Sequence, residues 1–220
     1  MKRHRFSTRL WHWINALCVV ILFMSGLNIS NAHRRLYWGD AGFDASEAWT
    51  AVMRFPGWST IPGYYDLAAA RAWHILMSWP FMIGLVLFWV AIIFNGHLRR
   101  KLMISRDEWN LEAIRDDIGN HLKLKSDNHG SAYNFLQKFS YLVVLAILLP
   151  LMIATGLAIS PGFEPAAPWL VEMLGGRQSA RSIHFIVAWG LFAFLAIHIA
   201  LVLLTGPLRQ IRDMITGGRT

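Results

Sequence analysis

Two histidines in one predicted helix are the residues of this sequence best placed to do chemistry. His184 and His198 lie fourteen residues apart in the last long apolar stretch. At about 100° per residue, fourteen helical steps fall within roughly 40° of four full turns, so both imidazoles face one side. At about 1.5 Å per residue they are ~21 Å apart, near opposite edges of a bilayer core of about 30 Å. This spacing predicts that one helix supplies ligands to two stacked haems.

The composition indicates the kind of protein that would position such ligands. The 220-residue chain is 55% hydrophobic and only 15% charged, with 11 Trp and 13 Phe, more than one soluble core of this length needs. Four apolar runs are long enough to span a bilayer as helices: residues 10–29, 72–94, 139–159 and 183–205. We expect an all-α membrane protein, in which residues 1–220 form a single four-transmembrane-helix bundle with two haems b stacked between the helices.

The distribution of basic residues predicts the orientation of this bundle. Of the 21 Lys and Arg residues, the N-terminal tail holds four, the loop between the second and third spans eight, and the C-terminal tail three. Because basic loops stay on the cytoplasmic side, we expect both termini to be cytoplasmic. The net charge of +8 is then explained by topology and by anionic lipid headgroups, and no nucleic-acid-binding module is recognised.

With this topology, four histidines fall into two pairs. His12 opens the first span and His198 lies late in the fourth, both at the inner edge of the membrane. His74 opens the second span and His184 the fourth, both at the outer edge. Ionisable groups inside a bilayer are costly, and neutral imidazole is a usual axial ligand of haem iron. Taken singly, His12 or His74 is equally well explained as an interfacial residue bonded to a carbonyl; the pairing favours bis-histidine haem.

Other metal chemistry finds less support. Zinc would need further Cys, His or carboxylate ligands near each pair, and none falls there. The single cysteine, Cys18, excludes an internal disulfide, covalent haem attachment through Cys-x-x-Cys-His and an iron-sulfur cluster. Gly26, fourteen residues after His12, would leave room for the outer porphyrin, although helix packing explains a glycine there as well.

Four motifs show a family resemblance. They are RFSTRLWHWIN (residues 5–15), NAHRRLYWG (31–39), GHLRR (96–100) and GGRQSARSIH (175–184). With the histidine pattern, they resemble the bacterial cytochrome b561 superfamily, which includes the b-type subunits of nickel-iron hydrogenases and formate dehydrogenase. Within it, the chain is most similar to the thiosulfate-reductase-type cytochrome b subunits. The resemblance implies that His12 and His198 hold a cytoplasmic-side haem b, and His74 and His184 an outer one.

The resemblance also implies a function. Its members sit in the bacterial inner membrane, exchange electrons with ubiquinone or menaquinone, and commonly serve an extracytoplasmic partner, here a molybdopterin or other redox subunit. An alternative is a superoxide:ubiquinone oxidoreductase that acts without a partner subunit. We therefore expect an electron-transfer subunit whose own enzymatic activity is open, since the paired ligands make a structural anchor or a transporter improbable.

Several further residues have expected roles. Haem propionates need cations, and Arg177 and Arg181 are placed for the outer haem, as Arg5 or Arg9 is for the inner one; anchoring to lipid phosphate is the alternative for each. A capping box at Ser105 and apolar residues through residue 122 predict an amphipathic helix. The loop 31–71 is rich in aromatic residues and is a candidate docking surface. Polar groups near the inner ends of the second and third spans are candidates for a quinone site: Asn95, His97, Arg99, Asn134 and Gln137.

Overall fold

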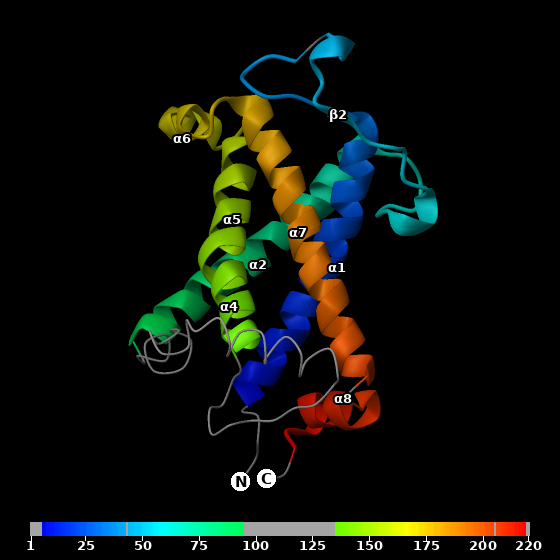
Figure 1. Cartoon of the computed structure of the whole chain (residues 1–220), viewed down its shortest axis with the longest axis vertical. Helices are drawn as coiled ribbons and strands as arrows, with labels where there is room; N and C mark the ends of the chain where they lie inside the picture. Colours follow the sequence, from blue (N-terminus) through cyan, green and yellow to red (C-terminus); the bar gives the residue numbers. More distant parts are fainter. Residues whose placement is uncertain (1–5, 43, 95–134, 205, 219–220) are drawn as a thin grey trace. The chain divides into compact units, whose positions relative to one another are not determined.

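The computed structural model describes residues 6–42, 44–94, 135–204 and 206–218, which are mostly helical (Figure 1). The chain divides into two compact units, residues 1–85 with 152–220, and residues 86–151. The four histidines assigned to haems all belong to the first unit. That unit therefore carries the candidate site.

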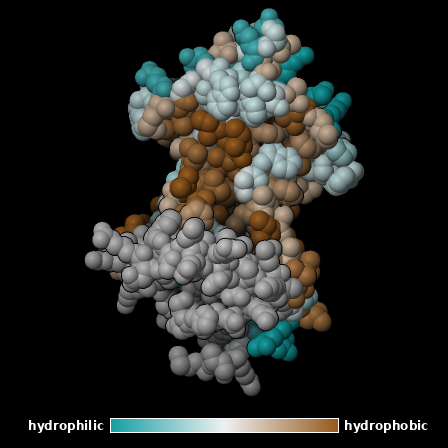
Figure 2. Space-filling model, in the orientation of Figure 1, coloured by the Kyte–Doolittle hydropathy of each residue, from teal (hydrophilic) through white to brown (hydrophobic). Residues whose placement is uncertain are grey.

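Four helical segments are long and apolar enough to cross a membrane, and each overlaps one of the predicted runs. They cover Phe6–Ala32, Leu67–Ala91, Lys138–Ala158 and Arg177–Leu204. In the space-filling view, hydrophilic residues gather at one end and hydrophobic residues cover the adjoining surface (Figure 2). Large apolar side chains such as Leu17, Ile93 and Leu203 are exposed, as expected where lipid rather than water is the solvent. The chain is thus a multi-pass membrane protein.

In the first unit, α1 (Phe6–Ala32) packs against both α2 (Leu67–Phe94) and α7 (Arg177–Leu204). The Phe23 ring stacks on that of Phe192 at 4.3 Å, and the Trp189 ring meets it edge-on at 5.4 Å. The Trp11 indole lies against Gly84 of α2, where a Cβ would collide with it. A glycine at this point allows the two helices to approach closely.

A folded segment covers one end of this unit, which we call the loop end. Strands β1 (Arg35–Leu36) and β2 (Thr50–Ala51) pair antiparallel, with the short helix η1 (Ala45–Glu47) between them. The Gly39 carbonyl accepts the backbone N–H groups of Gln178 and Ser179 at the start of α7. Ser182 donates to the Tyr37 carbonyl and accepts from the Trp49 indole. The hairpin therefore satisfies donors that the first turn of α7 leaves free.

Two asparagines of α1 hold the rest of the loop end. Asn28 is fully buried and donates to the carbonyls of Pro62 and Tyr64. Asn31 binds both backbone groups of Phe55, close to the helix η2 (Gly57–Ser59). On the α7 side, η6 (Glu164–Ala166) and α6 (Pro168–Met173) precede the two positive-φ glycines Gly175 and Gly176. The connections at this end are thus ordered by bonds to the spanning helices.

Two features of the helices differ from the sequence-based expectation. The third span is not one α-helix, since the π-helical η5 (Val144–Leu148) lies between α4 (Phe135–Val143) and α5 (Leu149–Ala158). A short helix, α8 (Pro207–Thr216), follows α7, where only a basic tail was expected. The end of the first unit formed by α8 and the start of α1 is called the terminal end. The expected amphipathic helix at 105–122 lies outside the described residues.

Candidate haem-binding site

His74 and His184 face each other near the loop end. His74 projects from the second turn of α2 and His184 from the second turn of α7, and their ring centres lie 6.3 Å apart. An imidazole nitrogen binds a metal at about 2.0–2.1 Å and lies roughly 1.1 Å from its ring centre, so two imidazoles on opposite sides of one metal have centres roughly 6.3 Å apart. The observed spacing would therefore fit one metal ion between the two rings.

A hydroxyl group orients each of these imidazoles. Ser25 Oγ lies 3.0 Å from His74 Nδ1, and Thr155 Oγ1 lies 2.9 Å from His184 Nδ1. Each hydroxyl also donates to a carbonyl of its own helix, Ser25 to Ile21 and Thr155 to Met152. In the tautomer with the ring proton on Nδ1, each hydroxyl oxygen accepts that proton, and Nε2 is the nitrogen left to bind a metal.

A glycine follows each orienting hydroxyl and lies beside the same ring. A Cβ at Gly26 would be 3.6 Å from His74 Cε1, and one at Gly156 would be 3.4 Å from His184 Cε1. Ser25-Gly26 in α1 and Thr155-Gly156 in α5 thus form matching ligand supports. Gly26, predicted from sequence to leave room for the porphyrin, lies against the His74 ring. Sequence spacing alone does not point to Ser25 or Thr155.

The second predicted pair belongs to the opposite end of the unit. His12 lies in the second turn of α1, with the Trp13 ring edge-on at 5.2 Å. His198 is exposed on the last third of α7. A polar ring that faces hydrocarbon is unfavourable, so a spanning helix needs something to cover this imidazole. A planar group bound between α1 and α7 would cover the His198 ring.

The two arginines predicted for the outer haem have different surroundings. Arg177 forms an ion pair with Glu164 and donates to the Ile159 carbonyl, so much of its guanidinium is engaged. Arg181 donates to Gln178 Oε1. It lies three residues before His184, on the same helix face. Of the two, Arg181 has more hydrogen-bonding capacity left for a carboxylate near the ligand pair.

Two more basic groups lie close to Arg181. Arg71 precedes His74 by three residues, as Arg181 precedes His184. Burial, followed by the charges of Arg181 and Arg71, holds the pKa of His33 below its usual value. Among the described residues no group bonds to His33 Nε2, a buried atom. His33, Arg71 and Arg181 form a basic cluster at the loop-end side of the ligand pair, and sequence spacing alone did not reveal Arg71 or His33 as members.

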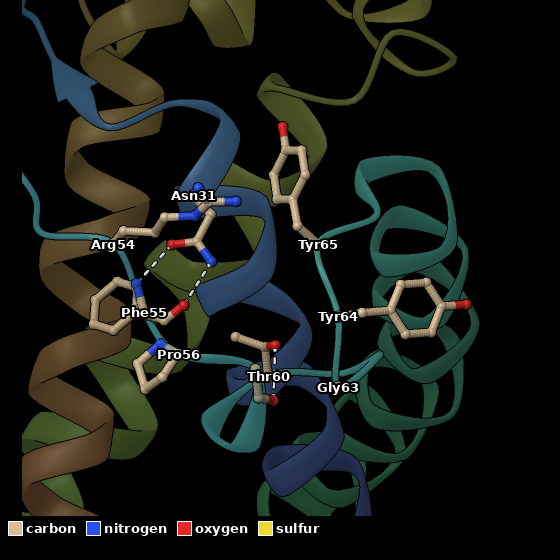
Figure 3. Close-up of a pocket in the computed structure, with 9 residues that line it drawn as sticks. Asn31, Arg54, Phe55, Pro56, Thr60, Gly63, Tyr64 and Tyr65 are labelled. Atoms are coloured by element: carbon tan, nitrogen blue, oxygen red, sulfur yellow. Dashed lines mark hydrogen bonds between the residues drawn. The ribbon is translucent and has the colours of Figure 1, made fainter.

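A pocket of about 350 Å³ opens in the loop segment (Figure 3). Asn31 fixes one wall through hydrogen bonds to the Phe55 backbone, of 2.7 and 3.0 Å. The Arg54 guanidinium lies 5.2 Å from the centre of the Tyr65 ring. The Phe55 ring lies 6.2 Å from that of Trp189 on α7. The lining residues are Asn31, Arg54, Phe55, Pro56, Gly57, Thr60, Gly63, Tyr64 and Tyr65.

Membrane-spanning helices that carry a facing pair of imidazoles indicate the class of membrane cytochromes. The family follows from comparison with known proteins. Residues 3–217 match the family of prokaryotic cytochrome b561, and the chain belongs to it. The resemblance seen in the sequence motifs is therefore confirmed, and the family implies b-type haem.

Two relatives indicate what such chains do. The protein-methionine-sulfoxide reductase subunit YedZ1 of Azospira oryzae is 32% identical over 197 residues, covering 89% of this chain and 87% of the relative. The Ni/Fe-hydrogenase B-type cytochrome subunit of Cupriavidus necator is 23% identical over 227 residues, covering 96% and 84%. No solved structure matches the chain. The protein is a membrane b-type cytochrome of the kind that serves oxidoreductases in electron transfer.

Proposed function

We propose that this protein is a di-haem cytochrome b that transfers electrons between the quinone pool and an extracytoplasmic redox partner. The observation that carries this proposal is the His74–His184 pair with its two orienting hydroxyls, since the 6.3 Å spacing fits one metal between the rings. His198, fourteen residues along the same helix, supplies a ligand at a second depth. His12 is the proposed partner of His198 at the terminal end.

Haem b, when bound, supplies a reversible one-electron Fe(III)/Fe(II) couple. The residues of the chain determine where that couple sits and how it is tuned. His74 and His184 would bind the loop-end haem, while Ser25 and Thr155 keep the Nδ1 protons and so direct Nε2 toward the iron. The apolar spans exclude water from the path between the two ligand depths.

Propionate binding extends the proposal to the basic groups. Arg181, with Arg71 and His33, would donate hydrogen bonds to the carboxylates of the loop-end haem. Arg177 would contribute the guanidinium N–H groups that its ion pair with Glu164 leaves free. At the terminal end, Arg9 already donates to the Ile215 carbonyl. Arg5 lies outside the described residues.

The proposed orientation has both termini in the cytoplasm of a bacterium and the loop end outside its inner membrane. The relatives are named as subunits of a methionine-sulfoxide reductase and of a hydrogenase, which supports an oxidoreductase partner; we propose a molybdopterin enzyme. The pocket around Arg54 and Tyr65 supports docking of this partner at the loop end. Arginine and tyrosine are common anchors of protein interfaces.

Ubiquinone or menaquinone is the proposed exchangeable substrate on the cytoplasmic side. The residues suggested for its site, Asn95, His97, Arg99 and Asn134, lie outside the described residues, as does the side chain of Gln137. The quinone site therefore stays a prediction from sequence. Its location does not affect the assignment of the two ligand pairs.

The experiment that tests the proposal measures haem content and quinol reactivity together. A pyridine haemochrome assay on purified protein should give two haems b per chain. Anaerobic addition of a short-chain ubiquinol or menaquinol should then reduce both haems. One haem per chain would overturn the di-haem proposal, and haems that no quinol reduces would overturn the quinone link.

One observation favours a second candidate function. The basic cluster of His33, Arg71 and Arg181 beside the loop-end pair would attract a small anion, as a superoxide:ubiquinone oxidoreductase requires. Such an enzyme would act without a partner subunit. Rapid haem reduction by superoxide distinguishes it from the leading proposal.

A further inference from the structure

Helix α8 has an apolar stripe that the described part of the chain leaves uncovered. Within Pro207–Thr216, Leu208 is 86% exposed, Ile211 43% and Ile215 60%. On a helix of about 100° per residue these three positions fall within an arc of about 60°. Such a stripe beside a polar face is typical of helices that lie in a membrane interface.

The position of α8 in the chain places this stripe at the membrane surface. α7 is a candidate span that ends at Leu204, and α8 begins at Pro207. The intervening Gly206 has φ 101°, a left-handed conformation that favours glycine and allows an abrupt change of direction. A helix that begins so soon after a span lies near the leaflet at that end, where an exposed apolar stripe would contact acyl chains.

The charged residues of α8 are suited to anionic lipid headgroups. Arg209 and Arg212 are both exposed, and Asp213 lies nearly opposite the apolar stripe. Arg212 flanks the stripe at about 70° from its centre, where a long side chain reaches the headgroup level. Anionic phosphates at this level attract Arg212 directly, and Arg209, about 130° from the centre of the stripe, adds positive charge on the polar face.

The far end of α8 is bonded to the turn of α1 that carries His12. Trp13 Nε1 donates to the Met214 carbonyl over 3.4 Å, and the Arg9 guanidinium donates to the Ile215 carbonyl. Carbonyls in the last helical turn lack partners in the helix, and a cation there is favourable. Arg9 and Trp13 lie three residues before and one residue after His12.

We propose that α8 binds anionic lipid headgroups through Arg209 and Arg212, and that the lipid-bound helix holds the His12 turn in position through Arg9 and Trp13. The first part depends only on α8 and the membrane. The second part rests on the proposed haem at His12 and His198. Arg9 and Trp13 are then positioning residues that act on the ligand through the helix backbone.

Lipid binding is tested by hydrogen exchange of the α8 amides in nanodiscs. Discs of phosphatidylglycerol should slow exchange relative to phosphatidylcholine discs, by roughly fivefold for each arginine engaged. The Arg209→Gln/Arg212→Gln double variant should lose this difference. Arg35→Gln/Arg54→Gln, with the same charge change at the loop end, should keep it. Equal exchange of wild-type α8 in both lipids overturns the proposal, as does equal slowing by inorganic phosphate in phosphatidylcholine discs.

The effect on His12 is tested by redox titration of the two haems in the same discs. The haem lost in His198→Ala should shift its midpoint potential between the two lipids, and the other haem should not. Arg9→Gln and Trp13→Phe should abolish that shift, while the retained His74–His184 haem shows that each variant is folded. An unchanged lipid response in both variants overturns the positioning role. A wild-type protein with one haem would instead refute the proposed function and leave the hydrogen-exchange result standing.

Discussion

Ser25 and Thr155 are the hydroxyl residues that contact His74 and His184, the proposed ligands of the loop-end haem. In the proposed site their oxygens accept the Nδ1 protons, which would leave the Nε2 atoms of both rings for the metal. The sequence predicted the histidines from spacing within one helix and from depth. It did not reveal the hydroxyls, because which serine or threonine meets which histidine depends on how four helices pack. The signal available was a hydroxyl residue followed by glycine in two apolar spans.

Replacing single ligands should remove single haems. His184→Ala should lose only the loop-end haem and His198→Ala only the other, because each residue serves a separate depth on α7. The number of haems per chain is measured by the pyridine haemochrome assay, and a redox titration shows which haem remains. Leu203→Ala, at an exposed apolar position of the same helix, is the control and should retain both haems. Loss of both haems from either ligand variant, with the protein still folded, would argue against separate sites.

Removing an orienting hydroxyl should change the potential of the loop-end haem alone. Ser25→Ala or Thr155→Val deletes the acceptor of an Nδ1 proton, which makes the imidazole a weaker donor to Fe(III). The midpoint potential should rise by roughly 20–60 mV, the equivalent of one hydrogen bond of about 0.5–1.5 kcal/mol. Among the described residues, the Ser30 hydroxyl is bonded to the Gly26 carbonyl alone, so Ser30→Ala should leave the midpoint potential unchanged. A shift confined to the other haem would reverse the assignment.

At the scale of helices, apolar runs predicted the four spans well and their interruptions poorly. Length and hydropathy sufficed for the spans because lipid requires every backbone group to be bonded within the segment. The π-helical η5 was not predicted, since nothing in Val144–Leu148 distinguishes it from α-helical sequence. α8 was not predicted either, because the basic residues of the C-terminal tail indicate its side of the membrane and not its secondary structure.

The loop end depends on polar residues inside an apolar helix. Asn28→Leu would leave the carbonyls of Pro62 and Tyr64 without their donor, a cost of about 1–3 kcal/mol. On heating, the Asn28→Leu variant should lose haem at a lower temperature than the wild-type protein. Haem absorbance measures this loss. Asn15→Leu is the matched control, since within the described part of the chain Asn15 donates to the Trp11 carbonyl of its own helix and to no loop carbonyl. Equal thermal stability of the two variants would count against this role.

For the whole molecule, the two proposed ligand depths on α7 would make an electron path across the membrane, and its direction depends on the orientation of the chain. The Lys and Arg distribution predicts that both termini are cytoplasmic. A reporter fused after Thr220 should be active if it requires the cytoplasm and silent if it requires the periplasm. The opposite result would place the basic cluster and the pocket inside the cell and exclude an extracytoplasmic partner at the loop end.

Removing basic residues from the loop end should distinguish the two candidate functions, the electron-transfer subunit and the superoxide:ubiquinone oxidoreductase. Arg35→Ala/Arg54→Ala removes two exposed charges from the hairpin and the pocket but leaves Arg34, which donates to the Val52 carbonyl and supports the hairpin. An acidic partner protein should lose part of its steered association rate, and its salt dependence should weaken. The rate of haem reduction by superoxide should change little, because superoxide needs only the basic cluster of His33, Arg71 and Arg181.

Arg71→Ala should have the converse effect. It removes one of the charges near His33 without touching the pocket, so an encounter with superoxide should slow and association with a protein partner should change little. Stopped-flow haem reduction by superoxide and haem oxidation by the purified partner measure the two rates. The electron-transfer subunit is supported if superoxide reacts slowly even with wild-type protein. Near-diffusional reduction by superoxide, with ubiquinone reduced in proportion by the protein alone, would establish the second function in its place.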